Sequence, residues 1–332
     1  MSTYKDEAFV GQAIESVLNQ SYTDIEFLII LDKPIDRTAE IVLSYKDDRI
    51  RIIENEQNLG LTISLNKGLK IARGEFLARI DADDICTPGR LEEQLAFFEQ
   101  HPDVAVCGGY FEFIESGEVI RFPLDHDAIK LELFRSNALC HSSVMFRTAL
   151  LRDKGLVYDE HFTFAQDYNL WSRAIQDLKF ANLNEILVRF RRHAGQISIE
   201  KAKEQQGFAD ETRLKQLENL GIIANEKEKA THLKLIKRET LENIEEYKYA
   251  MIWVEQLMDH NEQSAYFDGK LFGEFCKGLA HDAGRNYFIR KKYSRQLIKD
   301  LYNKEAELYR QHGFLGRLGI IIKSIIGWRA SG

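Results

Sequence analysis

The amino-terminal part of the chain alternates between two apolar periodicities, and this alternation constrains the fold more than any other feature. Segments with apolar residues every three to four positions are typical of amphipathic helices, and the continuous apolar runs between them are typical of buried strands. The predicted helices are residues 7–19, 36–45 and 61–72, and the predicted strands are residues 26–31, 49–53, 76–80, 104–114, 138–146 and 185–190. Repeated β-α-β units predict a right-handed, doubly wound and mostly parallel sheet.

One strand of such a sheet is missing from the amino terminus. A sheet of this class has an apolar strand before its first helix, but residues 1–4 stand almost directly against the helix predicted at 7–19. We therefore expect roughly six to ten further residues, the length of one ordinary strand, before Met1 in the natural protein. A chain without this buried strand should be markedly destabilised.

Three carboxylates, Asp81, Asp83 and Asp84, follow the strand predicted at 76–80, where the chain leaves the sheet. The carboxyl ends of strands are where ligands bind in open α/β sheets. Clustered carboxylates repel one another unless a cation neutralises them, and oxygen ligands favour Mg²⁺ or Mn²⁺. From this turn alone, a solvated loop that caps the next helix is an equal alternative. Thr87 as the N-cap and Pro88 as the first residue would start that helix.

Composition excludes several classes of protein. The chain has 332 residues, 44% of them hydrophobic, and its net charge of −7 argues against a nucleic-acid binder, which would need a basic face. Its four cysteines have no metal-binding or disulfide spacing, which favours a reducing cytoplasm. No apolar run approaches the roughly 20 residues that span a bilayer, and there is no secretory signal.

Several short motifs occur in a fixed order. They lie at residues 2–5, 16–22, 58–61, 65–66, 72–74, 141–147 and 165–167, with the Asp-Ala-Asp of residues 81–83 among them. In this order and spacing, residues 1–200 resemble a family 2 glycosyltransferase of the GT-A fold, of the bacterial kind that builds capsule, exopolysaccharide or lipopolysaccharide. The resemblance implies a catalytic domain at 1–200.

The resemblance implies which residues bind the nucleotide of a sugar donor. These are Ser2, Thr3, Tyr4, Asp32, Asn58 and Asp81. A phenol ring can stack on uracil, and a carboxylate can accept its imide N–H. The alternative for Asp32 is a loop residue that only caps the following turn. Lys33-Pro34 also departs from the turn that is common in the family, which puts the local loop shape in doubt.

The resemblance also implies a metal site. Asp83 corresponds to the residue that ligates Mn²⁺ or Mg²⁺, which neutralises the charge that builds on the departing diphosphate. His193 corresponds to a histidine that completes the metal or phosphate site in some relatives, and an exposed histidine in a turn is the alternative. Arg191 is expected on the acceptor and sugar side, or as a bidentate donor to the diphosphate.

Asp167 corresponds to the general base of the family. One carboxylate that removes the proton of the acceptor hydroxyl is sufficient for a reaction that inverts the anomeric configuration. The alternative is that Asp167 only caps its helix. Gln166 replaces the usual Glu of the motif, so acceptor positioning or the pKa of the base should differ. His141 is expected near the sugar and acceptor, or hydrogen-bonded beneath a loop.

The sequence thus predicts a metal-dependent inverting glycosyltransferase. It would move a sugar from a nucleotide-sugar donor, favoured to be a UDP-sugar, to a hydroxyl of a glycan or lipid-linked glycan. The alternative is a catalytically weak, truncated family member that acts as a binding or assembly subunit of a polysaccharide-synthesis complex. A donor assay with Mn²⁺, compared between this chain and Asp83→Asn, separates the two.

Beyond residue 200 the resemblance fades. Residues 201–312 predict a helical region, and residues 313–332 carry many apolar residues with Arg and Lys and no acidic residue. A basic amphipathic helix of this kind can lie in the interface of an anionic leaflet, which predicts a cytoplasmic enzyme peripheral to the inner face of the plasma membrane. The alternative is a terminal helix buried on the protein's own core or on a partner. Oligomerisation is left open.

Overall fold

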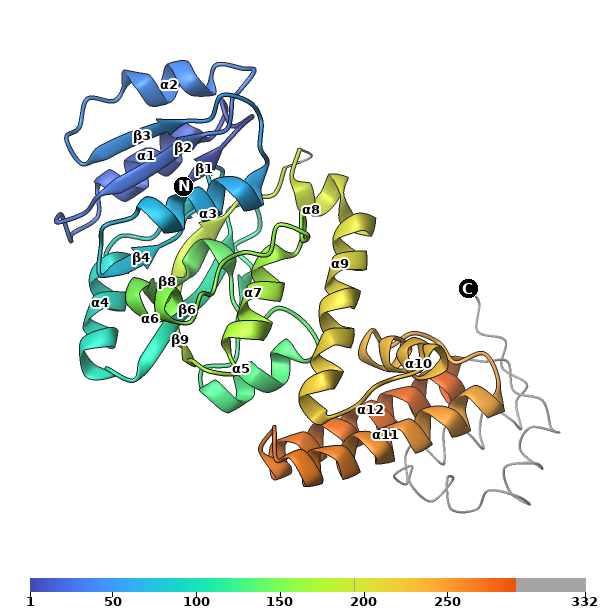
Figure 1. The fold of residues 1–332 in the computed structure, drawn as a ribbon. Helices are drawn as coiled ribbons and strands as arrows, with labels where there is room; N and C mark the ends of the chain where they lie inside the picture. The colour runs from blue at the N-terminus through green and yellow to red at the C-terminus, as the bar shows by residue number, and fades with distance from the viewer. Residues whose placement is uncertain (194, 291–332) are drawn as a thin grey trace. The chain divides into compact units, whose positions relative to one another are not determined.

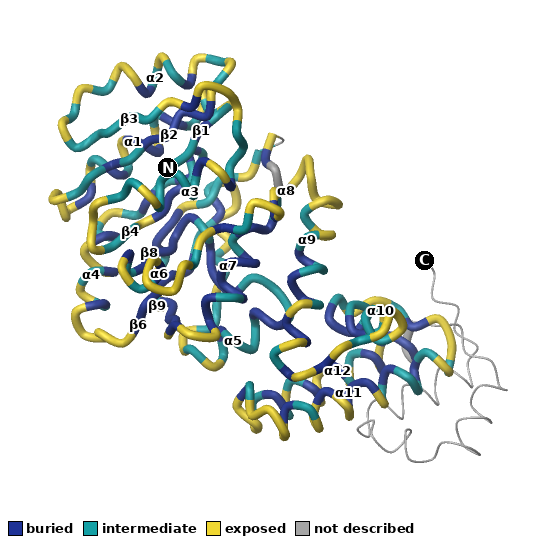
Figure 2. Tube along the Cα trace, in the orientation of Figure 1, coloured by how far each residue is buried: buried dark blue, intermediate teal, exposed yellow. Residues whose placement is uncertain are grey.

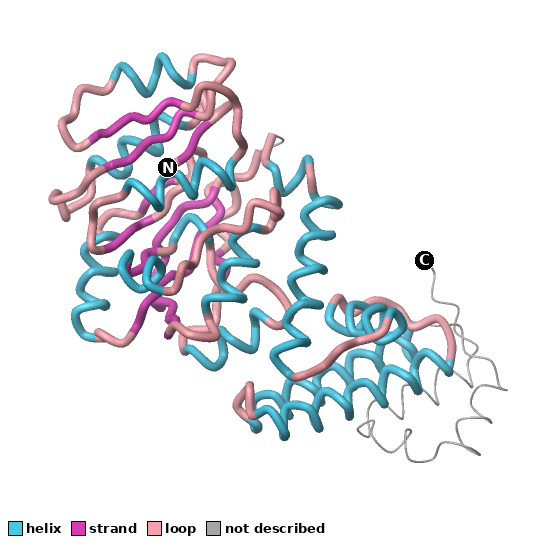
Figure 3. The backbone as a smooth tube through the Cα atoms, in the orientation of Figure 1, coloured by secondary structure: helices cyan, strands magenta, loops and turns pink. Residues whose placement is uncertain are grey.

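The computed structural model describes residues 1–193 and 195–290, which fall into two compact units. The first unit is Met1–Thr212, and the second begins at Arg213. Figure 3 shows strands only in the first unit among the described residues, and the second unit is helical there. The predicted fold class, an α/β domain followed by a helical region, is confirmed. The predicted boundary at residue 200 stays a prediction, and the predicted helix at 313–332 lies outside the described residues.

A three-stranded parallel sheet opens the first unit (Figure 1). Its strands are β1 (Ser2–Thr3), β2 (Phe27–Leu31) and β3 (Ile50–Glu54), and the helices that alternate with them are α1 (Val10–Leu18), α2 (Thr38–Ser44) and α3 (Leu61–Ile71). β2 pairs with β1 on one side and with β3 on the other. The helices and strands predicted up to residue 72 are therefore confirmed, with shifts of a few residues at their ends.

Alternate residues of β2 face opposite helix layers. Ile29 is buried with Val10 and Ile14 of α1. Ile30 points toward α3, because a Cβ on Gly68 would lie 3.3 Å from the Ile30 Cδ1. Side chains of a strand alternate between its two faces, so this sheet carries helices on both. Figure 2 shows β2 largely buried, β3 at intermediate burial and α2 exposed on its outer side.

The second sheet of this unit is mixed, in the order β4-β8-β6-β9-β5, with β7 paired to β6. Its strands are β4 (Phe76–Ala78), β5 (Ile85–Cys86), β6 (Val104–Phe113), β7 (Val119–Ile120), β8 (Met145–Arg147) and β9 (Lys179–Phe190), and its helices are α4 (Arg90–Gln100), α5 (His126–Leu133), α6 (Thr148–Asp153), α7 (Gln166–Ala174) and α8 (Ile197–Glu200). β6 and β9 are parallel, and the other pairs are antiparallel. The parallel winding predicted for the whole sheet is thus limited to β1–β3 and to the β6–β9 pair.

The two faces of the second sheet bury different helices. Val106 and Phe146 pack with Trp171 of α7 on one face. Cys107 and Met145 pack with residues of α4 on the other. Because neighbours in sequence point to opposite faces, this sheet is also a central layer between helices, and its strand ends carry the loops of the candidate site.

Two local predictions were wrong. The segment predicted as a strand at 138–146 contains a 3-10 turn, His141–Ser143, and only its last residues belong to a strand, the short β8. Helix α4 starts after Gly89, which has a left-handed φ of 80°, and not at Thr87. The Thr87 hydroxyl instead donates to the backbone carbonyl of Ile186, so a distant strand competes successfully for the capping group.

A groove with a volume of about 970 Å³ lies between β2 and β4, and Phe27, Leu28, Phe76 and Leu77 are among the residues that line it. β1 and β4 are the end strands of their respective sheets. In β4 the carbonyl of Glu75 and the amide of Arg79 bond to the segment that contains β8. Strand backbone groups alternate in direction, so those of Phe76 and Ala78 point toward the groove.

The amino group of Met1 lies where the backbone of a longer β1 would continue. It donates to the carbonyl of Leu28 at 3.0 Å, and the Met1 carbonyl accepts from the amide of Ile30 at 3.0 Å. Burial lowers the pKa of this amine to about 5. A further strand before Met1 stays a prediction.

The second unit is built on two long helices. They are α11 (Ile244–Ser264) and α12 (Gly269–Arg290), and α10 (Glu226–Ile236) precedes them in the chain. The boundary between the two units falls within α9 (Ala202–Lys215). Trp253 of α11 is buried and donates from its indole N–H to His232 of α10 at 3.3 Å. No helix among the described residues is both long and apolar enough to cross a membrane. All four cysteines are free and buried.

The groove predicts the effect of an amino-terminal extension. Six residues rich in Val and Ile, placed before Met1, should raise the free energy of unfolding by about 2 kcal/mol, because apolar burial and pairing with two strand edges exceed the cost of ordering the segment. Urea denaturation of the extended chain measures this. A Gly-Ser extension of equal length is the control, and equal stability of the two extended chains would contradict the prediction.

Candidate functional site

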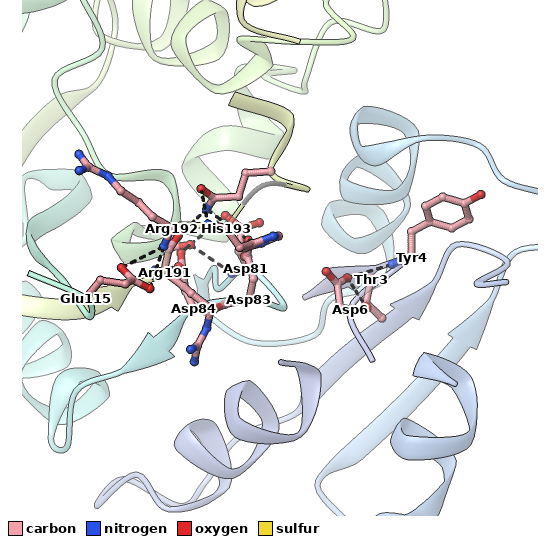
Figure 4. A network of polar contacts seen from close by, with 12 residues as sticks. Thr3, Tyr4, Asp6, Asp81, Asp83, Asp84, Glu115, Arg191, Arg192 and His193 are labelled. Atoms are coloured by element: carbon pink, nitrogen blue, oxygen red, sulfur yellow. Dashed lines mark hydrogen bonds and ion pairs between the residues drawn. The ribbon is translucent and has the colours of Figure 1, made fainter. Parts of the chain in front are cut away.

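The candidate site is built around the turn that follows β4. It carries Asp81, Asp83 and Asp84, and one ligand oxygen of each lies within 4.8 Å of those of the other two. Figure 4 shows this turn facing Arg191, Arg192 and His193, with Thr3, Tyr4 and Asp6 forming a second group. The predicted clustering of the three carboxylates is therefore confirmed.

A buried arginine anchors Asp81. Both terminal nitrogens of Arg79 donate to the two carboxylate oxygens of Asp81, and the Arg79 side chain is only 5% exposed. Arg79 holds the pKa of Asp81 below its usual value, against the effect of burial. A paired guanidinium and carboxylate form a bidentate contact with fixed geometry, so Asp81 has one defined orientation.

Ser142 connects Asp81 to Asp84. Its hydroxyl lies 2.9 Å from Asp81 Oδ2 and within hydrogen-bonding distance of Asp84 Oδ2. Asp84 is fully buried, and its other oxygen accepts from the backbone amide of Arg191 at 3.1 Å. A hydroxyl carries one proton and can donate to only one carboxylate at a time. Burial and the charges of Asp81 and Asp83 raise the pKa of Asp84 well above its usual value, which favours the protonated form that can donate to the second contact.

Asp83 faces a histidine. His193 Nε2 lies 3.1 Å from Asp83 Oδ2, and Gln196 Nε2 lies 3.5 Å from the same oxygen. Burial and the neighbouring Asp81 charge raise the pKa of Asp83. The structure thus brings together Asp83 and His193, which are 110 residues apart in sequence.

The donor set of this turn fits a divalent cation. Arg79 neutralises Asp81, but the raised pKa values of Asp83 and Asp84 reflect negative charge held at close range with burial. Carboxylate oxygens suit Mg²⁺ or Mn²⁺. Asp83 and His193 are the residues that would hold such an ion, and it would offset the repulsion within the turn.

The residues at the end of β1 form a separate polar group. Thr3 is buried, and its hydroxyl donates to Asp6 Oδ2 at 2.6 Å. The backbone amide of Tyr4 donates to the same oxygen at 3.1 Å. Burial raises the pKa of Asp6, and the charge of Asp81 also contributes. The resemblance did not indicate Asp6, which orients the backbone where Ser2, Thr3 and Tyr4 are predicted to meet a nucleotide.

The carboxylate of Asp32 is engaged within the protein. It accepts from the side chains of Asn55 and Asn58, at 2.8 and 3.1 Å, and from the backbone amides of Leu59 and Gly60, both at 2.8 Å. A positive φ of 86° at Gly60 lets the turn present both amides to one carboxylate. Asp32 and Asn58 therefore stabilise the turn before α3, and their contact with a nucleotide stays a prediction.

Asp167 lies in the first turn of α7, next to the buried Gln166. Ala165 precedes them in the left-handed region with a φ of 54°, an arrangement that is strained for a residue with a side chain. Asn137 donates from Nδ2 to Asp167 Oδ2 at 2.6 Å. Burial raises the pKa of Asp167, while the backbone N–H of Tyr168, the Arg79 charge and the Asn137 contact oppose this.

His141 contacts a tyrosine beneath the site. Its Nε2 lies 2.8 Å from the hydroxyl of Tyr158. Burial and the nearby Arg79 charge lower the pKa of His141 well below its usual value, so the imidazole is neutral at physiological pH. His141 stays a candidate for contact with sugar or acceptor, as a neutral hydrogen-bonding group.

The guanidinium of Arg191 has partners within the protein. Its Nε donates to the backbone carbonyl of Asp83 at 3.1 Å, and one terminal nitrogen donates to Gln12 at 2.6 Å. It also lies over the Phe9 ring at 4.7 Å. Arg191 thus ties the acidic turn to α1, and its predicted role toward sugar or diphosphate is not tested by these contacts.

Sequence reasoning missed several residues of this site. Arg79 was detectable, since it lies two positions before Asp81 at the end of a strand. Ser142 lies beside the candidate His141 but has no chemical signature of its own. Asn137 and Gln196 reach their partners across 30 and 113 residues, and no local pattern indicates such contacts.

Comparison with known proteins assigns the family. A glycosyl transferase family 2 model matches residues 1–165. An uncharacterized glycosyltransferase of Methanocaldococcus jannaschii is 38% identical over 201 residues, which cover 58% of this chain and 69% of that protein. The chain belongs to glycosyltransferase family 2. It is therefore a glycosyltransferase, as the motifs predict.

Two further proteins are similar to this family 2 glycosyltransferase. The Escherichia coli UDP-Glc:alpha-D-GlcNAc-diphosphoundecaprenol beta-1,3-glucosyltransferase WfgD is 29% identical over 208 residues, covering 61% of this chain and 80% of WfgD. A crystal structure of S. aureus TarS in complex with UDP-GlcNAc superposes with a TM-score of 0.58 at 20% identity, covering 86% of this chain and 88% of that one. The TarS likeness confirms the fold.

The contacts of the acidic turn predict that loss of the Ser142 hydroxyl lowers the stability of the protein substantially. Ser142→Ala removes the group that bridges Asp81 and Asp84 and leaves buried polar atoms without that partner, so the free energy of unfolding should fall by about 2 kcal/mol. Urea denaturation measures the loss. Ser116→Ala, at an exposed loop position, should change stability by less than about 0.5 kcal/mol. Equal effects of the two substitutions would contradict the bridging role.

Proposed function

We propose that this glycosyltransferase moves a sugar from a nucleoside-diphosphate donor to a hydroxyl of a glycan or lipid-linked glycan, with inversion at the anomeric carbon. The observation that supports this most is the pairing of Asp83 with His193 at 3.1 Å on a turn whose charges also act on Asp167. The cation-binding turn would then assist cleavage of the bond between the sugar and the diphosphate, and the candidate base would take the proton of the acceptor hydroxyl.

The donor would bind between the end of β1 and the acidic turn. Tyr4 offers a ring for a base to stack on, and Asp81 offers carboxylate oxygens for ribose hydroxyls. Uracil is the favoured base, because WfgD is named as using UDP-Glc and TarS was crystallised with UDP-GlcNAc. Ser2, Thr3, Asp32 and Asn58 would shape this part of the site through the turns that they hold.

Asp83 and His193 would hold Mn²⁺ or Mg²⁺. When bound, such an ion neutralises the charge that develops on the departing diphosphate, which makes it a better leaving group. The carboxylate and imidazole already lie in contact, so their hydrogen bond would give way to ligation. Arg191 keeps the turn fixed, because its guanidinium donates to the backbone carbonyl of Asp83 and its backbone amide donates to the carboxylate of Asp84.

Asp167 would act as the general base. Its carboxylate takes the proton of the acceptor hydroxyl while that oxygen forms a bond to the anomeric carbon. The bond from that carbon to the diphosphate oxygen breaks, and the diphosphate leaves with the electron pair on the opposite face. A single displacement of this kind inverts the configuration. His141 and Gln166 would orient the sugar and the acceptor beside this carboxylate.

The similarity to WfgD also supports a proposal for the acceptor and for the location of the enzyme. WfgD is named for an acceptor linked to diphosphoundecaprenol, which supports a lipid-linked glycan here. An enzyme with such an acceptor works at the membrane surface, and we propose a peripheral position on the cytoplasmic face. The segment 313–332, which would provide the contact with anionic lipid, lies outside the described residues.

Two substitutions test the proposed roles. With UDP-glucose and Mn²⁺, Asp83→Asn and Asp167→Asn should each lower the release of UDP on the order of a hundredfold or more, because one removes a metal ligand and the other a general base. A coupled UDP assay measures this. Asp48→Asn, at an exposed position, is the matched control.

Equal release of UDP by the parent chain and both variants, with UDP-glucose and with UDP-GlcNAc, would contradict the proposal. That result would favour the second candidate function, a binding or assembly subunit of a polysaccharide-synthesis complex. Loss of activity in Asp83→Asn alone would keep the metal site and remove Asp167 as the base.

A further inference from the structure

We propose that Asn137 is the residue that positions the carboxylate of Asp167 for proton transfer. The proposal rests on the proposed function, because it takes Asp167 to be the base. Asn137 belongs to none of the motifs that carry the family resemblance. It acts through Asp167, and it is therefore a positioning residue.

The contact between the two side chains is short and has one orientation. Asn137 Nδ2 lies 2.6 Å from Asp167 Oδ2. The other end of the same amide, Oδ1, accepts from the backbone N–H of Leu139 at 3.3 Å. A flipped amide would set its carbonyl oxygen against the carboxylate and its NH₂ against a backbone N–H. The local network thus fixes which group of Asn137 faces Asp167.

The loop that carries Asn137 is held on both sides. Ala138 and Leu139 are buried, and the carbonyl of Ala138 accepts from Asn182 of β9 at 3.1 Å. The hydroxyl of Tyr168, the residue after Asp167, donates to the carbonyl of Leu133 at the end of α5 at 2.6 Å. Helix α7 and the loop after α5 are therefore fixed to each other beside this contact.

The start of α7 is constrained as well. Ala165 has a left-handed φ of 54° directly before Gln166 and Asp167. Strained backbone of this kind persists where the surrounding structure enforces it, and it concentrates at functional positions. Here it sets the direction in which the first turn of α7 presents Asp167. Backbone and side-chain constraints thus converge on one carboxylate.

The charges around Asp167 show what the amide contributes. Burial raises the pKa of Asp167, the Asp81 charge raises it further, and the Arg79 charge lowers it. Tyr158 also faces this group, and burial keeps its phenol protonated at neutral pH. Asn137 donates a hydrogen bond to the ionised carboxylate, which favours the form that can accept a proton without adding a charge. Burial opposes the ionisation of this carboxylate, and the Asn137 amide counteracts that effect.

Removal of the amide should therefore raise the pKa of Asp167. Below that raised pKa a larger share of Asp167 is protonated and cannot act as a base, so the acid limb of kcat/KM moves to higher pH. In Asn137→Ala, kcat should also fall on the order of tenfold at neutral pH through misplacement of the carboxylate, while KM for the donor stays nearly constant.

Asn137→Asp, which is almost the same size, should have a larger effect than Asn137→Ala. Two carboxylates at this distance share a proton, so the acid limb should move further to higher pH. Asn184→Ala is the matched control, because Asn184 is exposed on β9. A role of Asn137 in folding alone would lower stability in both variants without this ordered movement of the acid limb.

Carboxyl ¹³C NMR titration of the full chain tests the proposal without a donor. The Asp167 signal is assigned by its absence in Asp167→Asn, and its pKa should rise in Asn137→Ala, rise more in Asn137→Asp and stay the same in Asn184→Ala. The pH profile of UDP-glucose hydrolysis should follow this order. An unchanged Asp167 pKa in both Asn137 variants overturns the proposal. Full hydrolysis by Asp167→Asn overturns the proposed base, and with it the role of Asn137.

Discussion

The ion pair between Arg79 and Asp81 is the interaction on which the candidate site depends. Three carboxylates on one short turn repel one another, and a buried bidentate guanidinium removes that repulsion at the first of them. Ser142 extends the anchor to Asp84. Asp81 and Asp84 are thus held by the protein itself, and Asp83 is left facing His193, where a cation would complete the charge balance.

The same buried arginine acts on both the acidic turn and Asp167, the proposed base. Its charge lowers the pKa of Asp81, opposes the rise that burial causes in the pKa of Asp167, and helps to keep His141 neutral. Because the Arg79 charge acts on both the acidic turn and the candidate base, the protonation states of the two are coupled. This fits a reaction in which the leaving diphosphate gains charge while the acceptor loses its proton.

Local sequence patterns predicted the helices and strands up to residue 80 and the acidic turn, because apolar periodicity and strand ends depend on residues that are neighbours in sequence. They failed where a distant group competes for a local one. The Thr87 hydroxyl bonds to Ile186 instead of capping α4. The donors that the turn at Asn58 supplies to Asp32 were also not foreseen, and the contact of Asp32 with a nucleotide stays a prediction. The antiparallel pairing of β4 with β8 and the contact of Asn137 with Asp167 depend on chain segments that meet only after folding.

We propose that Asp83 and His193 hold a divalent ion against a nucleoside diphosphate. Electron paramagnetic resonance of Mn²⁺, titrated into the chain with UDP present, tests it most directly. We predict that Mn²⁺ binds saturably. Loss of a residue that only orients a metal ligand lowers metal affinity roughly 10–100-fold, and Asp83→Asn should lower it by more than this. Asp48→Asn should leave the Mn²⁺ affinity unchanged. Equal Mn²⁺ affinity in the parent chain and in Asp83→Asn would contradict the account.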